Sequence, residues 1–328
     1  MKKILIIGGA GYVGTPLQIL LADSGYEVTV FDTFWYYQNL TPPRDAIKYI
    51  CSDVRDIHAL EKALENQDAC IHLACISNDP SYELDEKLSR EINYEAFSNF
   101  IAITNKSSLK RLIFASSSSV YGVKKESKVT EELSCEPLTD YSRFKVECEK
   151  LITNQLSQNI TSVILRPSTI CGYSQRQRFD LVVNLLTLSA ITSGKINVDG
   201  GEQFRPNLHI DDMVSCYKKI LESPSEIVDR QILNVAGENL KVAEIAEKIR
   251  NIVGQKCRID YKPIIDARSY RVSGDKIKSL IGFTPAKNVD DAVQDLVTAF
   301  SKNMFPDWQS SRYYNIKKMK ELINQKKV

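Results

Sequence analysis

Residues that can move a proton gather in two short stretches of the sequence. Tyr141 and Lys145 lie in "DYSRFKVECEK", spaced so that they share one face of the helix this stretch predicts. A free tyrosine has a pKa of about 10, and an ammonium group one helical turn away favours its phenolate form. The run "FASSSSVYG", Phe114–Gly122, supplies four serine hydroxyls upstream of this pair. Together these residue types suit acid–base chemistry on a hydroxyl group.

A glycine-rich turn near the start of the chain indicates a nucleotide site. "GGAGYVG" follows an apolar run and opens a predicted helix, with Gly8, Gly11 and Gly14 in GxxGxxG spacing. Glycines permit a tight turn close to a pyrophosphate, which the N-terminus of a helix attracts. The next apolar run ends at Asp32, whose carboxylate can accept both hydroxyls of a ribose and would repel a 2′-phosphate. The pattern predicts NAD rather than NADP, and the alternative is a purely structural glycine turn.

The elements that must position these residues follow a regular order in the first half of the chain. Short β-branched runs alternate with helical stretches of ten or more residues, which is typical of a doubly wound parallel sheet. Ligands bind outside the carboxyl ends of such strands, where the serine run is expected. After Arg166 the alternation weakens: residues 179–194 predict a helix, and residues 196–212 predict a turn-rich segment. We predict an α/β fold, a doubly wound Rossmann sheet with a smaller mixed α/β domain.

Composition excludes several classes of function. The 328 residues are 43% hydrophobic and 26% charged with a net charge of +2, so nothing indicates binding to nucleic acid or a membrane surface. No apolar run reaches the roughly 18 to 20 residues of a transmembrane helix. Eight cysteines without a CxxC pair, and only three histidines, favour reduced thiols and no metal site. We expect a cytoplasmic protein.

Taken together, the motifs resemble those of extended short-chain dehydrogenase/reductases, in the branch of NAD-dependent nucleotide-sugar epimerases and dehydratases. The resemblance covers nearly the whole chain and includes the glycine turn, "SDV", "HLAC", "SSSSVYG", "LRPSTICGY", "FRPNLHIDDM" and "NVAG". It implies an NAD-binding Rossmann domain of residues 1–166 and about 207–237, and a nucleotide-sugar-binding domain of residues 167–206 and about 238–328. It also implies a homodimer or higher homo-oligomer, joined through the helices around Arg90–Asn105 and Tyr141–Gln158.

The resemblance implies a role for each motif residue. Tyr141 as phenolate would remove the proton of a sugar hydroxyl, commonly at C4, while Ser117 hydrogen-bonds the same oxygen and Lys145 holds the nicotinamide ribose. The implied cofactor-binding residues are Gly8, Gly11, Tyr12, Val13, Gly14, Asp32, Asp53, Val54, Leu73, Ala74, Cys75, Asn93, Tyr141 and Lys145. The implied substrate-binding residues are Ser118, Ser119, Asn184, Arg205 and Arg268.

Ser118 and Ser119 narrow the choice of reaction. Related 4,6-dehydratases place an acidic pair directly after the catalytic hydroxyl, and decarboxylating relatives carry a glutamate there. A serine hydroxyl cannot take over that acid–base work efficiently. The sequence therefore favours oxidation at C4 of a nucleotide sugar. The preferred hypothesis is a 4-epimerase that re-reduces its 4-keto intermediate. The alternative is a net 4-dehydrogenase that releases the ketone, as in some relatives that serve surface polysaccharide synthesis; a 3,5-epimerase/reductase and a non-catalytic NAD sensor are less favoured.

Two features remain open at this level. Arg176 and Arg178 in "SQRQRFD" could bind the nucleotide or another acidic group, or face solvent. The aromatic run Phe34–Leu40 could pack over adenine or form a subunit contact. The sequence does not identify the nucleotide or the sugar.

Overall fold

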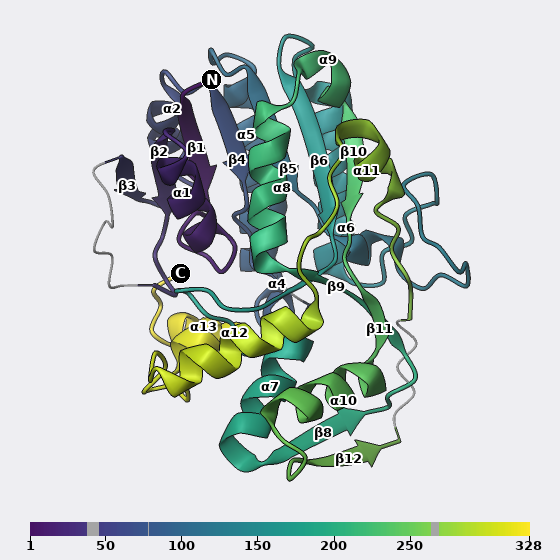
Figure 1. Ribbon diagram of the computed structural model, residues 1–328. Coiled ribbons are helices and arrows are strands. Elements are labelled where there is room, and N and C mark those ends of the chain that lie inside the picture. Colours follow the sequence, from purple (N-terminus) through teal and green to yellow (C-terminus); the bar gives the residue numbers. More distant parts are fainter. Residues whose placement is uncertain (38–45, 78, 264–268) are drawn as a thin grey trace.

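A seven-stranded parallel sheet forms the larger part of the molecule (Figure 1). The computed structural model describes residues 1–37, 46–77, 79–263 and 269–328. The strand order is β10-β6-β5-β4-β1-β2-β3, and every neighbouring pair runs parallel. The strands are β1 (Lys3–Ile7), β2 (Glu27–Asp32), β3 (Ile47–Cys51), β4 (Ala69–His72), β5 (Arg111–Ala115), β6 (Thr161–Pro167) and β10 (Gln231–Val235). This topology confirms the predicted doubly wound Rossmann sheet.

Helices cover both faces of the sheet. Ile4 and Ile6 of β1 point to one face, under α1 (Gly14–Asp23), α8 (Ile210–Glu222) and α11 (Asp275–Ile281). Leu5 and Ile7 point to the other, under α2 (Ile57–Leu64), α5 (Ala96–Thr104) and α6 (Asp140–Gln155). Because successive strand residues face opposite sides and both sides are buried, the strands read as continuous apolar runs.

The segment between β4 and β5 contains the helical stretch expected around Arg90–Asn105, with a π-helical turn inside it. The chain forms α3 (Asp79–Tyr82), α4 (Glu86–Arg90), a π-helical turn at Glu91–Glu95, and then α5. A π-turn inserts extra backbone into a helix and is frequent near functional sites. Here it carries Asn93, whose side chain bonds both backbone polar groups of Ile76, beside the carboxyl end of β4.

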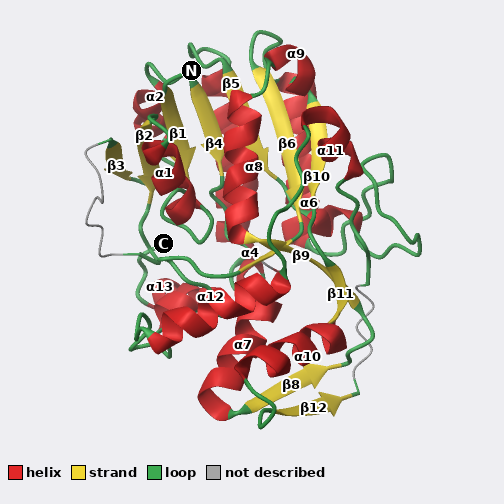
Figure 2. Ribbon diagram, in the orientation of Figure 1, coloured by secondary structure: helices red, strands yellow, loops and turns green. Residues whose placement is uncertain are grey.

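The second part of the molecule lies below the carboxyl ends of the large sheet (Figures 1 and 2). Its strands are β7 (Thr169–Cys171), β9 (Phe204–His209) and β11 (Asn239–Lys241) in one small sheet, and β8 (Lys195–Asp199) and β12 (Arg258–Lys262) in another. Its helices are α7 (Val182–Ser193), α10 (Val242–Val253) and α12 (Val289–Ser301), which share one hydrophobic core. Two short helices, α9 (Ser225–Val228) and α13 (Asn315–Asn324), lie elsewhere on the molecule.

The prediction of a turn-rich segment after α7 missed the strands β8 and β9, which lie on either side of the turn at residues 200–203. In β8 only Ile196 and Val198 are buried, and they alternate with exposed residues. Glycines on both sides of β8 and a proline within β9 mask that weak period-two signal. The proposed division into two interleaved domains stays a prediction.

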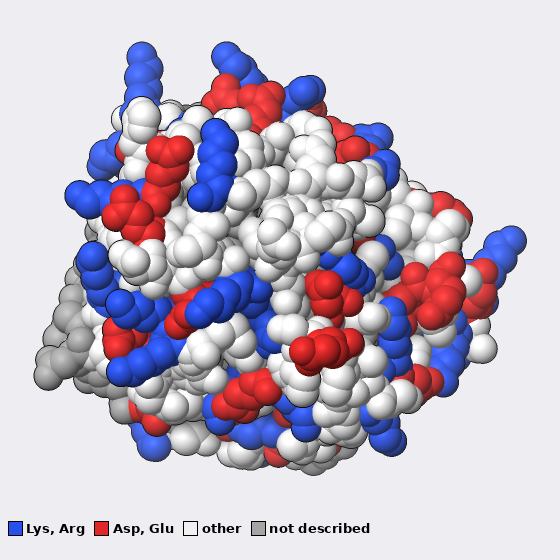
Figure 3. All heavy atoms as spheres, turned by 90° about the horizontal axis from the view of Figure 1, so that it is seen from above, with Lys and Arg blue, Asp and Glu red and all other residues white. Residues whose placement is uncertain are grey.

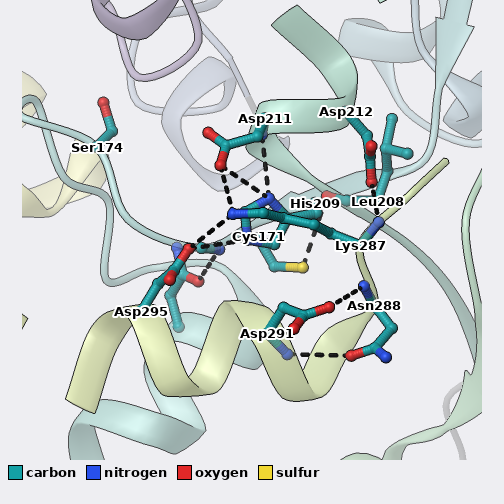
Figure 4. Close-up of polar contacts among 12 residues, drawn as sticks. Cys171, Ser174, Leu208, His209, Asp211, Asp212, Lys287, Asn288, Asp291 and Asp295 are labelled. Atoms are coloured by element: carbon teal, nitrogen blue, oxygen red, sulfur yellow. Dashed lines mark hydrogen bonds and ion pairs between the residues drawn. The ribbon is translucent and has the colours of Figure 1, made fainter. Parts of the chain in front are cut away.

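A charged cluster joins the second part to α8 (Figure 4). His209 accepts a hydrogen bond from the backbone N–H of Asp211 at 3.1 Å, and its Nε2 lies 3.1 Å from Asp295 of α12. The ammonium of Lys287 lies 2.6 Å from Asp211 and 3.5 Å from Asp295. Since a protein cation already faces both carboxylates, we assign this cluster a structural role rather than metal binding. The absence of a metal site stays a prediction.

Figure 3 shows the face at the amino ends of the large sheet. Basic and acidic side chains are interspersed across the described residues of that face, rather than gathered by sign as on a polyanion-binding surface. Within the described parts of the chain, no helix has both the length and the apolar character needed to cross a membrane.

Candidate active site

One cleft gathers most of the predicted site residues at the carboxyl ends of the large sheet. It encloses about 410 Å³ and borders the end of β1, where the strand order reverses toward β4. Parallel α/β sheets bind ligands at this switch point. The predicted residues that line it are Gly8, Gly11, Tyr12, Val13, Gly14, Asp32, Asp53, Val54, Leu73, Ala74, Cys75, Ser117, Ser118, Ser119 and Tyr141.

At two glycines of this turn, the neighbouring backbone lies too close to leave room for a side chain. Gly8 has a φ of +83°, and a Cβ there would lie 2.5 Å from the backbone nitrogen of Ala74. A Cβ on Gly14, the first residue of α1, would lie 2.5 Å from the carbonyl oxygen of Gly9. These glycines therefore allow β1, β4 and α1 to meet, which leaves the N-terminus of α1 open to the cleft.

Asp32 is fixed beside this turn. Its carboxylate accepts hydrogen bonds from the backbone N–H groups of Ala10 and Phe34, each at 2.9 Å. Burial raises the pKa of Asp32, while these two hydrogen bonds and the charge of Arg176 act in the opposite direction. A held carboxylate one strand away from a glycine turn is the arrangement that a dinucleotide ribose requires, so the residues present fit NAD.

Replacing Asp32 by asparagine should lower the affinity for NAD about tenfold or more and narrow the preference for NAD over NADP. The neutral amide keeps the shape but loses the charged acceptor and its repulsion of a 2′-phosphate. The ratio of the two dissociation constants, from fluorescence titration, measures this. Asp199→Asn, at the exposed last residue of β8, is the matched control. An unchanged ratio in Asp32→Asn would rule out a ribose contact.

The loop after β3 supplies a second acidic residue to the cleft. Asp53 accepts three hydrogen bonds from Arg55, from its backbone N–H at 2.9 Å, Nε at 3.0 Å and a terminal nitrogen at 2.8 Å. The arginine holds the loop in one conformation and places Val54 in the cleft wall.

The serine run is ordered rather than a flexible polar loop. It leads from β5 into a 3₁₀ turn, Ser118–Tyr121. The hydroxyl oxygen of Ser117 accepts hydrogen bonds from the backbone N–H and the hydroxyl of Ser119, at 3.1 and 2.9 Å. The hydroxyl of Ser118 lies 3.4 Å from that of Tyr270. Three hydroxyls are thereby held in fixed positions on the cleft wall.

A buried polar network supports this run from behind. Ser116 donates a hydrogen bond to Glu149, which also accepts two from Arg166, at 2.6 and 3.0 Å. Arg166 donates to the Tyr121 hydroxyl at 2.9 Å, and that hydroxyl donates to Asn234 at 2.7 Å. Burial alone would lower the pKa of Arg166, but the hydrogen bonds and charge of Glu149 outweigh it and raise the pKa.

Tyr141 and Lys145 reach the cleft from the first turns of α6. Thr139 caps this helix through a reciprocal pair of hydrogen bonds with Ser142. The Lys145 ammonium donates to the carbonyl oxygen of Ala115 at 2.6 Å and lies 5.9 Å from the centre of the Tyr141 ring. Lys145 is thus held between the end of β5 and Tyr141, and the described lining of the cleft does not include it.

Other predicted residues lie behind the cleft or away from it. Asn93 positions the loop at Ile76, as described above, and Asn184 is fully buried. The Asn184 side chain accepts from the backbone N–H of Gly172 at 3.0 Å and donates to the hydroxyl of Tyr12 at 3.0 Å. Asn93 and Asn184 are absent from the lining among the described residues, and their ligand contacts stay predictions.

The two remaining substrate-binding predictions concern arginines. Arg205 is half-buried in β9 and donates to the carbonyl oxygen of Phe204 at 3.1 Å, and the described lining of the cleft does not include it. Arg268 lies outside the described residues. Both roles stay predictions.

Several further residues line the cleft without an assigned role from the sequence, among them Tyr36, Arg176, Arg178, Tyr270 and Asn315. The two arginines and the aromatic run had been noted, although residues 38–40 of that run lie outside the described chain. Tyr270 and Asn315 come from distant parts of the sequence, and no local motif marks them.

The acidic side chains of the cleft lie apart from the serines. Among the described lining residues, the carboxylates are Asp32 and Asp53, at the ends of β2 and β3. Strands β1 and β4 separate them from β5 and its serines. The region near Tyr141 therefore offers hydroxyls and cations, which suits reversible removal of a hydroxyl proton.

Comparison with known proteins agrees with this arrangement. The model of the NAD dependent epimerase/dehydratase family matches residues 4–236. An uncharacterized UDP-glucose epimerase of Bacillus subtilis, YtcB, is 28% identical over 316 residues, covering 91% of this chain and 98% of that protein. The UDP-glucose 4-epimerase of Lactobacillus helveticus is 23% identical over 320 residues, covering 89% and 94%.

A solved structure is similar over almost the same length. It is a UDP-glucuronic acid 4-epimerase from Bacillus cereus in complex with UDP-glucuronic acid and NAD. Its TM-score is 0.80 with 25% identical residues, and the match covers 92% of this chain and 99% of that one.

Proposed function

Because the chain belongs to the NAD-dependent epimerase/dehydratase family, we propose that it is a 4-epimerase of a UDP-activated sugar. The observation that carries this proposal is the pairing of Tyr141 and Lys145 with a serine run free of carboxylates at the same end of the cleft. The similar proteins named as UDP-sugar 4-epimerases support it.

In the proposed mechanism, Tyr141 removes the proton of the C4 hydroxyl and returns it after the sugar has turned. Ser117 donates a hydrogen bond to the same oxygen, and its contact with Ser119 fixes the direction of that bond. Lys145, held by the carbonyl of Ala115, stabilises negative charge on Tyr141. NAD, when bound, supplies the acceptor and donor of hydride.

Ser118 and Ser119 lack the acidic groups that elimination of water would need. Elimination of water from the sugar requires a group that protonates the leaving hydroxide and one that removes a carbon-bound proton. The hydroxyls described at this end of the cleft suit neither task. Glu149, the nearest acid of the network behind the serines, is bound by Arg166 and Ser116. The 4-keto sugar is therefore re-reduced rather than dehydrated.

The test is incubation of the purified protein with UDP-glucose, UDP-N-acetylglucosamine and UDP-glucuronic acid, followed by proton NMR of the products. An epimerase converts a substrate to its C4 epimer and accumulates no NADH. A 4-keto sugar with stoichiometric NADH would identify a net 4-dehydrogenase instead. Loss of water from the sugar with uptake of solvent deuterium at C5 would identify a dehydratase.

The proposal extends to a homodimer formed through α5 and α6, to a cytoplasmic location and to a role in polysaccharide synthesis. Light scattering tests the first of these directly. A mass of one subunit in solution would exclude the dimer.

A further inference from the structure

A segment from β7 to α7 lines the cleft and is hydrogen-bonded to the glycine turn. The Tyr12 hydroxyl donates to the carbonyl oxygen of Gly172 at 2.7 Å, and the Ser174 hydroxyl donates to the carbonyl oxygen of Tyr12 at 2.8 Å. Both Tyr12 and Ser174 are buried. The segment is thus fixed to the N-terminal end of α1, and it carries Arg176 and Arg178 into the cleft.

Arg176 is a buried cation whose contacts are neutral groups. Its exposed fraction is 4%, it donates to the amide oxygen of Asn315 at 2.6 Å, and its guanidinium lies 4.3 Å from the centre of the Tyr36 ring. Its Nε has no hydrogen-bond partner, and it forms no ion pair with a carboxylate of the described residues. Burial and the nearby charge of Arg178 lower the pKa of Arg176 to about 10. A buried charge of this kind is costly unless an anion is bound beside it.

Arg178 differs from its neighbour, because its charge is already balanced. It forms a two-bond ion pair with Asp180, at 2.9 and 3.3 Å, and donates to the hydroxyl of Ser77 at 3.2 Å. Of the two arginines, Arg176 therefore carries the positive charge that remains available to a ligand.

The surroundings of Arg176 indicate which ligand. Its charge acts on Asp32 at the end of β2, and Tyr36, its stacking partner, belongs to the segment after that strand. The segment that carries Arg176 is hydrogen-bonded to Tyr12, within the turn that precedes α1. Arg176 thus faces the region where a dinucleotide places its phosphates, and a planar guanidinium suits phosphate oxygens.

We propose that Arg176 binds the pyrophosphate of NAD and that Asn315 and Tyr36 are positioning residues for its guanidinium. This contact adds a side-chain cation to the backbone N–H groups of the glycine turn. The proposal rests on the NAD dependence of the family and not on which sugar is the substrate.

Asn315 links this contact to the end of the chain. It is the first residue of α13, its backbone N–H donates to Asp180 at 3.0 Å, and its side-chain amide donates to Ser77 at 2.8 Å. Cofactor binding through Arg176 therefore also holds α13 against the cleft.

The test compares ligands with and without phosphate on protein stripped of nucleotide. The dissociation constants of NAD, ADP and adenosine are measured by titration for wild type, Arg176→Gln and Arg176→Lys, with Arg258→Gln on exposed β12 as the matched control. Arg176→Gln should weaken NAD and ADP about tenfold to hundredfold and leave adenosine unchanged. Arg176→Lys should recover part of the loss, because it restores the charge without the planar fork. Asn315→Ala should show a smaller loss with the same dependence on phosphate.

Three results would overturn the proposal. An equal loss for adenosine and ADP would show that Arg176 only supports the fold. A loss confined to UDP binding by NAD-loaded protein would assign the arginine to the substrate's diphosphate instead. If Arg176→Gln does not fold, Arg176→Lys decides the question: unchanged ADP and NAD affinities would exclude a planar guanidinium contact. Failure to find an epimerase product would leave all these binding results standing.

Discussion

Tyr141→Phe should lower the turnover number by about 10²–10⁴-fold while NAD remains bound. The substitution removes one oxygen from a residue at the start of α6 and changes neither the helix cap at Thr139 nor the position of Lys145. Without the phenolic oxygen, the proton of the C4 hydroxyl has no acceptor at this position. The turnover number is measured with the UDP-sugar that the NMR test identifies.

The control for this variant is Tyr49→Phe, which deletes a phenol oxygen that bonds Gln18 away from the serines. It should retain nearly full turnover. The NAD released by denaturation should be the same for both variants and wild type. A Tyr141→Phe protein that turns over at the wild-type rate would remove Tyr141 from the proposed mechanism.

Glu149→Ala should destabilise the protein by about 3–5 kcal/mol, because it leaves Arg166 buried without its counter-ion. The two side chains of this pair are 6% and 5% exposed. The loss should appear as a lower midpoint in urea unfolding. Turnover should fall as well, since Glu149 also accepts the hydroxyl of Ser116, next to Ser117.

A double replacement, Glu149→Leu with Arg166→Met, separates these two effects. Removing both charges should restore much of the stability, because no uncompensated ion remains. Turnover should stay low, since Ser116 still lacks its acceptor and the Tyr121 hydroxyl still lacks the donor Arg166. Full activity in the double variant would show that the buried pair does not position the serines. An unchanged urea midpoint in Glu149→Ala would contradict the expected cost of the unpaired charge.

Sequence patterns predicted the large sheet because its strands and motifs are local. Gly8, Asp32 and Ser117 each follow an apolar run directly, so finding the strand also located the residue at its carboxyl end. Parallel pairing then brought these ends together, as expected for a doubly wound sheet. NAD dependence followed from the glycine turn, Asp32 and the family.

The features that the sequence did not predict depend on contacts between distant segments. For Arg176 the sequence left open whether it binds the nucleotide or another acidic group or faces solvent, because its burial depends on Tyr36 and Asn315, far away in the chain. Asn184 belongs to a motif of the family, yet its hydrogen bonds to Gly172 and Tyr12 could be found only after folding. The π-turn at Glu91–Glu95 has no known signature in its residues.

Because Asn315 lies near the C-terminal end of the sequence, its contact with Arg176 forms late in synthesis of the chain. During translation the glycine turn leaves the ribosome long before Asn315, and N-terminal units generally fold first. The first six strands of the parallel sheet, β1 to β6, can pair while the chain is still growing, but the contact between Arg176 and Asn315 must wait until α13 has been synthesised. Unfinished chains that stop before Asn315 would thus bind NAD more weakly than finished ones. Firm retention of the cofactor then marks the molecules whose synthesis has passed this point.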